Sequence, residues 1–411
     1  MLRDTSRSRF PARGVGSSDR RGAARSLLLG ALFVFLAGGA SGALAWKWIG
    51  GGASRPAARA AARGEERAPQ DALHADDRGV ALPSGDGRVA RSADAIVREF
   101  KKIKTPGFGN SLSEEEFDRA CDAAFERQNA LASELLERHP RDRRVTDLMH
   151  TRWCNMTNGM GQAEAVIRET ETVIASGALP ALRAMAIRLR AQSALDLGSI
   201  PSAQVLEWIS VADTTEPLDH ETSGYLHARF AECRTADPAE QKRHIALARE
   251  HFSKAKRSMD ETGFLEKVQR SFGKPLTFEF EDALGTGTWR RAPGQPVLVH
   301  LWSAGHWGLP ATAADPDVDE LTRALPRLRS AQVAVIAATD AEHMGCRGDP
   351  AESARRLGVT WPYALGVRGE DPDALSPGGY SSFLWIDAEG RASAWCRRLP
   401  PMLEHIGVNP R

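Results

Sequence analysis

The sequence contains no pair of cysteines spaced as a reactive or metal-binding motif. Its five cysteines lie at positions 121, 154, 233, 346 and 396, and none belongs to a C-x-x-C pair. Zinc knuckles and dithiol redox motifs both depend on such spacing. Five scattered thiols are also too few for the disulfide framework of a small secreted domain. The sequence therefore excludes all three of these motif classes.

The chain also lacks an excess of charge of either sign. Its formal net charge is +1 at pH 7, which gives no reason to expect a nucleic-acid partner. Hydrophobic residues make up 42% and charged residues 26%, as in globular proteins that bury a core. At 411 residues the chain exceeds one ordinary domain, so we expect two folded units and connectors.

One long uncharged run lies near the N-terminus. Residues 1–25 carry seven arginines and two aspartates and are expected to form a basic cytoplasmic tail. Residues 26–48 follow, with no charge from Ser26 to Trp46, about the ~20 residues of a membrane-spanning helix. Because basic residues stay in the cytoplasm, the pattern predicts a single-pass signal anchor with the folded part outside, in the periplasm. A cleaved signal peptide, with Ala43-Leu44-Ala45 as its cleavage site, remains the alternative.

The rest of the chain divides into a linker and a helical region before its last third. Residues 49–92 are rich in Ala, Gly, Arg and Pro, so they are predicted to be a disordered linker. In residues 93–272, apolar side chains recur at helical spacing, as in Phe117, Cys121 and Phe125, and short breaks at Gly, Pro and Asp separate the segments. We expect an irregular α-helical repeat-like domain, similar to tetratricopeptide helix pairs.

The pattern changes at residue 273, where strands appear. Alternating residues predict a strand pair near the start, and short β-branched runs predict buried parallel strands joined by a crossover helix. A second helix, a hairpin and a short closing helix follow. Residues 273–411 thus give a β-α-β-α-β-β-α order, which describes a thioredoxin-like α/β domain. The whole chain is predicted to combine an N-terminal transmembrane helix, a helical-repeat domain and this C-terminal domain.

This last third resembles the membrane-anchored thioredoxin-fold proteins of bacteria, namely the TlpA- and ResA-type thiol–disulfide oxidoreductases and the related AhpC/TSA peroxiredoxins. The resemblance implies a thioredoxin-like fold outside the cytoplasm, preceded by a helical domain. The resemblance rests on four sequence motifs: G-K-P-L from Gly273, the V-L-V-x-x-W strand ending at Trp302, Trp361-Pro362, and F-L-x-I-D-x-x-G from Phe383 to Gly390.

The reactive residues that the resemblance implies are missing. The attacking cysteine of the W-C-x-x-C motif falls on His306, and the resolving cysteine falls on Leu309. The family's cis-proline, six residues before Asp387, falls on Ser381, after Tyr380. The chemistry needs a thiolate of lowered pKa at a helix N-terminus, which neither replacement supplies. The resemblance therefore points to a degenerate member whose catalytic residues are lost, with a trans bond expected between Tyr380 and Ser381.

The sequence favours a binding or scaffolding protein of the cell envelope over an enzyme. We expect a protein or peptide partner, no cofactor and no nucleic acid, with Trp307 and Tyr380 bordering any surviving groove. An enzyme that uses a displaced cysteine, Cys346 or Cys396, is one alternative, and whether these two form a disulfide stays open. A copper(I) carrier is another, for which His306, His343 and Cys346 are the candidate ligands.

Overall fold

The computed structural model describes residues 91–106, 114–195, 197–256, 263–276, 279–285, 287–301, 316–339, 350–365 and 381–409. All of them belong to one compact unit, which begins at Gly52. The expected basic tail and signal anchor, and almost all of the expected linker, lie outside these residues. Among the helices of the described ranges, none combines the length and apolarity needed to span a bilayer.

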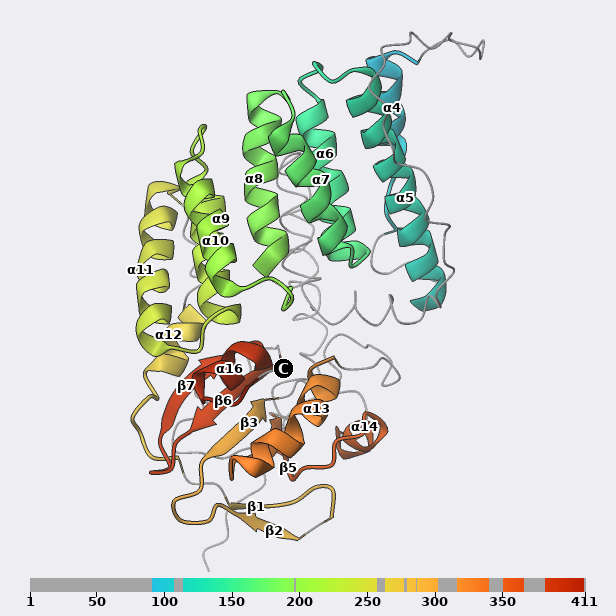
Figure 1. The fold of residues 1–411 in the computed structure, drawn as a ribbon. Coiled ribbons are helices and arrows are strands. Elements are labelled where there is room, and N and C mark those ends of the chain that lie inside the picture. The colour runs from blue at the N-terminus through green and yellow to red at the C-terminus, as the bar shows by residue number, and fades with distance from the viewer. Residues whose placement is uncertain are drawn as a thin grey trace, which may run out of the picture. The chain divides into compact units, whose positions relative to one another are not determined.

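The described part of residues 93–272 is helical, as its periodicity predicts, and successive helices lie side by side (Figure 1). A π-helical turn at Asn155–Gly159 extends α6. The helices are α4 (Ala93–Lys102), α5 (Glu114–Arg138), α6 (Val145–Cys154), α7 (Ala163–Ala175), α8 (Pro180–Leu195), α9 (Ser202–Thr214), α10 (His220–Cys233), α11 (Pro238–Lys254) and α12 (Gly263–Gln269).

Helix α11 shows how local sequence sets these boundaries. The Asp237 side chain caps its N-terminus by accepting hydrogen bonds from the backbone N–H groups of Ala239 and Glu240. Pro238 occupies the first turn, where its missing N–H is not needed. Gln241, His244, Ile245, Ala248 and Phe252 then form the buried face. The spacing of these five residues is that of one stripe along a helix.

The strand-rich region contains a five-stranded sheet in the order β5-β4-β3-β6-β7 and a separate two-stranded sheet, β1-β2. Strands β3, β4 and β5 are parallel, whereas β6 and β7 run antiparallel to their neighbours. The strands are β1 (Glu279–Glu281), β2 (Thr288–Arg290), β3 (Val297–Leu301), β4 (Ala334–Thr339), β5 (Tyr363–Leu365), β6 (Ser382–Ile386) and β7 (Ala392–Cys396). The helices are α13 (Pro316–Ser330), α14 (Pro350–Arg356) and α16 (Leu399–His405).

The element order agrees with the order that the sequence predicts, with one addition. Strand β5 was not predicted, because three residues are too few to show alternation. It forms because Tyr363 pairs with Ala337 at the edge of the parallel ladder. The backbone N–H of Tyr363 also donates a hydrogen bond to the side chain of Asp282, at 2.9 Å. Long-range partners therefore supply what local sequence does not.

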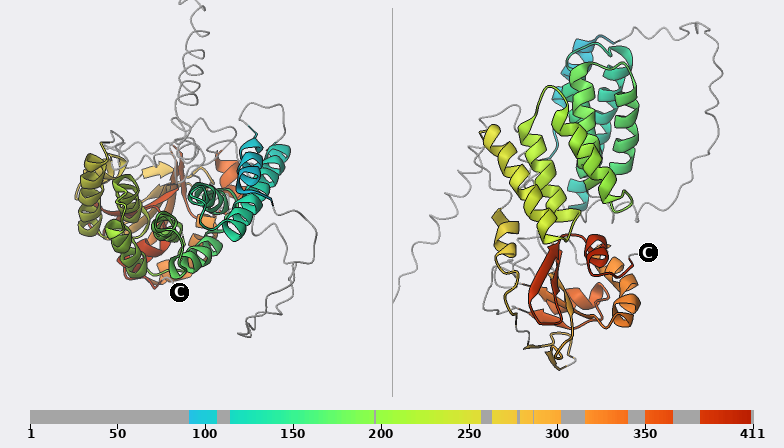
Figure 2. Two further views of the ribbon diagram at one scale, coloured as in Figure 1. Left: turned by 90° about the horizontal axis from the view of Figure 1, so that it is seen from above. Right: turned by 60° about the vertical axis from the view of Figure 1, so that its left-hand side comes forward.

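The two faces of the sheet are covered by different parts of the chain. One face packs against α13, α14 and α16, through residues such as Leu325, Ala354 and Leu399. The other face packs against residues of the helical region: Ala231 of α10, Ile245 of α11, and Leu265 and Val268 of α12. The views in Figures 1 and 2 agree in placing β7 beside these helices. The helical and strand-rich regions therefore share a hydrophobic core.

Hydrogen bonds join the two regions along β7, the edge strand of the sheet. The side-chain Nε2 of Gln241, which is fully buried, donates to the backbone oxygen of Trp395 at 2.7 Å. The backbone N–H of Arg397 donates to the backbone oxygen of Glu232 at 2.8 Å. Its guanidinium also pairs with the Glu232 carboxylate at 3.1 Å. An open sheet edge exposes unpaired backbone groups, and here helices α10 and α11 satisfy part of that edge.

Candidate functional site

The candidate site lies at the end of β3, the strand after which the sequence resemblance places a reactive motif. All five residues of β3 are buried. Side chains alternate along a strand, so Val297, Val299 and Leu301 enter the core shared with α10–α12, whereas Leu298 enters the core under α13 and α16. His300 shares the orientation of Leu298. The last residues of β3 therefore direct an imidazole into the core on the α13 side.

The ring of His300 is held by contacts on its face and at its edge. It is fully buried and lies parallel to Phe383, with the ring centroids 5.0 Å apart and an interplanar angle of 13°. Trp361 lies at a tilt, 6.4 Å away between centroids. The Nε2 atom is 2.9 Å from the Oγ of Ser381. These contacts are those of a hydrogen-bonded core histidine rather than those of an exposed base.

Ser381 is the replaced residue whose position the structure describes. It stands just before β6, in the place where the family resemblance implies a proline, and its hydroxyl lies against His300. The two positions are also neighbours through the ladder, where His300 pairs with Phe383. The polar contact thus links the end of β3 to the residue that precedes β6.

The other predicted site residues lie outside the described ranges. They are His306, Trp307, Leu309, His343, Cys346 and Tyr380. The expected groove between Trp307 and Tyr380, the copper(I) ligand set, the trans bond at Tyr380–Ser381 and the fate of Cys346 therefore remain predictions. Trp361, which belongs to the W-P dipeptide of the resemblance, is buried in the core under α13.

Cys396 does not have the environment of a redox thiol, which argues against the alternative that assigned it one. It ends β7, is fully buried, and its Sγ donates to the backbone oxygen of Glu232 at 3.4 Å. Burial raises the pKa of the Cys396 thiol to about 12. A nucleophilic cysteine needs a lowered pKa and access to solvent. No disulfide joins Cys396 to Cys121, Cys154 or Cys233.

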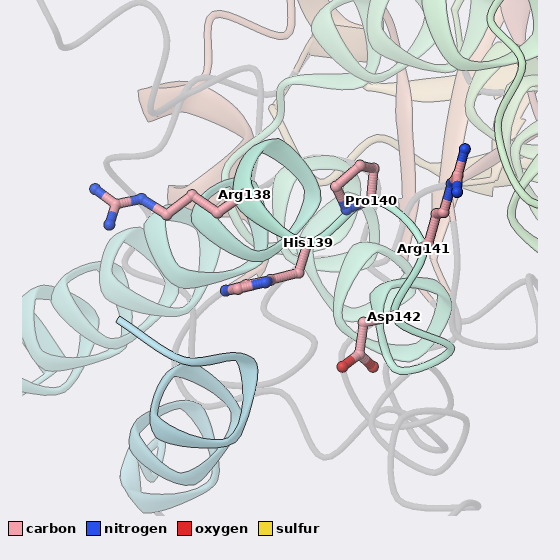
Figure 3. A pocket seen from close by; sticks show the side chains of 5 residues that line it. All are labelled: Arg138, His139, Pro140, Arg141 and Asp142. Carbon is pink, nitrogen blue, oxygen red and sulfur yellow. The ribbon is translucent and has the colours of Figure 1, made fainter. Parts of the chain in front are cut away.

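A surface hollow of about 420 Å³ lies at the turn between α5 and α6, and Figure 3 shows its lining residues. His139 Nε2 is 3.0 Å from the backbone oxygen of Arg91, and the Arg144 guanidinium donates to Asp142. Hydrogen bonds from Arg144 lower the pKa of Asp142 well below its usual range. In Figure 3 the side chains of Arg138, Arg141 and Asp142 point in different directions. These contacts describe a stabilised turn rather than a ligand site.

Sequence reasoning missed two groups of functional candidates. The residues that join helices to the sheet edge, Gln241 and Glu232, look like ordinary helical residues, and no local signal marks them. A cluster of histidines and Asp213 in α9, α10 and α11 was also missed. Its signal was present, because histidines recur at seven-residue spacing in two successive helices. The side chains that could hold a metal within the described residues therefore lie in the helical region.

Comparisons with solved structures give weak likenesses, of which two are described here. The thioredoxin domain of a thiol-disulfide oxidoreductase from Bacteroides vulgatus matches with a TM-score of 0.24 and 18% identity, over 33% of this chain and 94% of that one. A thioredoxin-like protein from Bacteroides caccae matches with a TM-score of 0.26 and 11% identity, over 74% of this chain and 97% of that one. No family model and no curated protein matches the sequence. Likenesses at this level carry no conclusion about activity.

Proposed function

We propose that this chain is an extracytoplasmic, membrane-anchored binding or scaffolding protein whose thioredoxin-like domain performs no dithiol chemistry. The observation that carries the proposal is the environment of Cys396. Only Cys346 and Cys396 follow residue 273, and neither is part of a C-x-x-C pair. Cys396 is buried and its pKa is raised to about 12, so at neutral pH it stays a protonated thiol.

The contacts at the end of β3 support the same proposal. In a redox site, the end of this strand leads to a thiolate that must meet a substrate. Here His300 contacts Ser381 and stacks on Phe383 inside the core. These contacts stabilise the domain and include no thiol.

The shared core supports a scaffolding role. Helices α10, α11 and α12 pack on the sheet, and hydrogen bonds from Gln241 and to Glu232 fix β7 to them. The helices and the sheet therefore hold each other in place, so a protein or peptide partner that binds one of them would meet a rigid surface. The proposed anchor at residues 26–48 and linker at 49–92 would hold this body near the membrane on the periplasmic side.

Insulin reduction by the purified full chain in detergent micelles, with dithiothreitol as the electron source, tests the proposal. We expect the wild-type chain and the Cys346→Ser and Cys396→Ser variants to reduce insulin no faster than dithiothreitol does alone. Turnover well above that rate would overturn the proposal. Its loss in Cys346→Ser would assign the activity to a displaced thiol, and its persistence in both variants would assign it to a thiol of the helical region.

A further inference from the structure

Four histidines occupy matching positions on the neighbouring helices α10 and α11. His220 and His227 are seven residues apart on α10, as are His244 and His251 on α11. Seven residues are close to two helical turns, so each pair shares one helix face. The Nδ1 atoms of His227 and His244 lie 2.9 Å apart, and those of His220 and His251 lie 3.2 Å apart. The antiparallel hairpin therefore brings four imidazoles into one seam.

Helix α9 adds a carboxylate to this seam. Oδ2 of Asp213 is 3.0 Å from Nε2 of His227. The other oxygen, Oδ1, is buried and makes no hydrogen bond of normal geometry to the described residues, although the side chain of Ser223 also acts on this carboxylate. One ligand atom each from Asp213, His227 and His251 lie within 4.8 Å of one another. A buried carboxylate oxygen without a donor is costly, and a cation beside it would remove that cost.

We propose that Asp213, His227 and His251 bind a divalent transition-metal ion of the zinc class. Imidazole nitrogen and carboxylate oxygen both bind Zn²⁺ at about 2.0–2.2 Å, and three protein ligands leave a fourth position for water or another ligand. Thiolate or thioether ligands, which would favour copper(I), are not among the three residues. The inference is independent of the proposed function, because the site lies in α9–α11 and not at the end of β3.

Metal binding requires neutral imidazole and ionised carboxylate. We therefore expect the affinity of the site to fall as the pH is lowered and the histidines become protonated.

His244 supplies the outer contact that a ligating histidine needs. If His227 binds the ion through Nε2, its Nδ1 carries the proton and donates it to Nδ1 of His244. Arg243, now 3.3 Å from Nε2 of His244, has a 61% exposed side chain and can turn away to allow this tautomer.

Access to the site comes from one side. His227 and His244 are buried, with exposed fractions of 4% and 1%, whereas Asp213, His220 and His251 are half-buried. An ion can therefore enter past the half-buried residues and reach His227 behind them.

Metal binding to the full chain tests this inference. The purified protein would be treated with a chelator, dialysed, and titrated with Zn²⁺, and with Co²⁺ as a visible-absorbance probe. We expect one equivalent of ion per chain and a rise in the thermal unfolding midpoint with Zn²⁺. The His251→Gln and Asp213→Asn variants should each weaken binding by more than about 100-fold, and His244→Gln by about 10- to 100-fold.

Helical content from circular dichroism would show that each variant folds. His251→Gln and Asp213→Asn change half-buried side chains and so leave the helix hairpin intact. His405→Gln, at an exposed position on α16, is the matched control and should bind as the wild type does. Absence of binding by the folded wild-type chain would overturn the proposal. Binding that survives His251→Gln but is lost in His343→Gln or Cys346→Ser would also overturn it.

Discussion

Gln241 of α11 donates a hydrogen bond from its side chain to the backbone oxygen of Trp395 in β7, across 154 residues of sequence. The same Nε2 also lies within hydrogen-bond distance of the backbone oxygens of Ala231 and Thr235. One buried amide thus connects the end of α10, the turn before α11 and the edge strand of the sheet. The helical region is fixed to the sheet at this point.

Replacement of Gln241 by Leu should weaken that junction. The change keeps the side-chain volume similar but leaves buried carbonyl oxygens without their donor. We expect a loss of about 1–3 kcal/mol in the free energy of unfolding, measured by urea denaturation. Gln204→Leu, at an exposed position on α9, is the matched control and should change stability by less than about 0.5 kcal/mol. Equal effects of the two changes would contradict this account of the junction.

Gly224 is required by the close approach of α10 and α11. A Cβ added there would lie 2.8 Å from two ring carbons of Phe252. Gly→Ala in an ordinary helix gains about 1 kcal/mol, but overpacking here should instead cost about 1–3 kcal/mol. Thermal unfolding of Gly224→Ala checks this expectation.

The control for this prediction is Gly177→Ala, where no atom lies within 4 Å of the added Cβ. We expect no loss of stability there. The second change Phe252→Leu should recover part of the loss in Gly224→Ala by making room for the methyl group. If Gly224→Ala were as stable as the wild type, the conclusion that α10 and α11 approach too closely at Gly224 for a side chain would be wrong.

The contact between His300 and Ser381 should be measurable as a coupling energy. A double-mutant cycle with His300→Phe and Ser381→Ala should give about 0.5–1.5 kcal/mol, because His300 is fully buried and its hydrogen bond to Ser381 is partly buried. Ser382→Ala provides the neighbouring control. Its Oγ is buried without a hydrogen-bond partner in the described residues, so its removal should be neutral or stabilising. A coupling near zero would mean that the contact adds nothing to stability.

Much of the fold could be predicted because its signals are local. The apolar stripe of α5, the Asp237 cap of α11 and the β-branched run of β3 each depend on neighbouring residues. Strand β5 could not be predicted, since its pairing of Tyr363 with Ala337 is a long-range contact. The same reason explains why the sharing of one core by α10–α12 and the sheet was not foreseen.

The candidate site divides in the same way. The absence of cysteine at positions 306 and 309 is plain in the sequence, and so is the serine at 381. The burial of Cys396 is not, because a thiol near a chain end looks equally suited to the surface or the core. The histidine seam required knowledge that α10 and α11 are antiparallel with His227 opposite His244. Sequence spacing shows which residues share a helix face, but only packing shows which faces meet.

The most direct test of the central claim, that residues 273–411 hold no reactive thiol, is the pH dependence of cysteine alkylation. The folded full chain would receive a pulse of iodoacetamide between about pH 6 and 9, and labelling would be read by mass spectrometry. Because the pKa of Cys396 is about 12, we predict that it stays unlabelled until the chain is unfolded in urea. Cys346 should label no faster than free cysteine does at the same pH. Rapid labelling of either cysteine with a midpoint below about pH 7 would contradict the account.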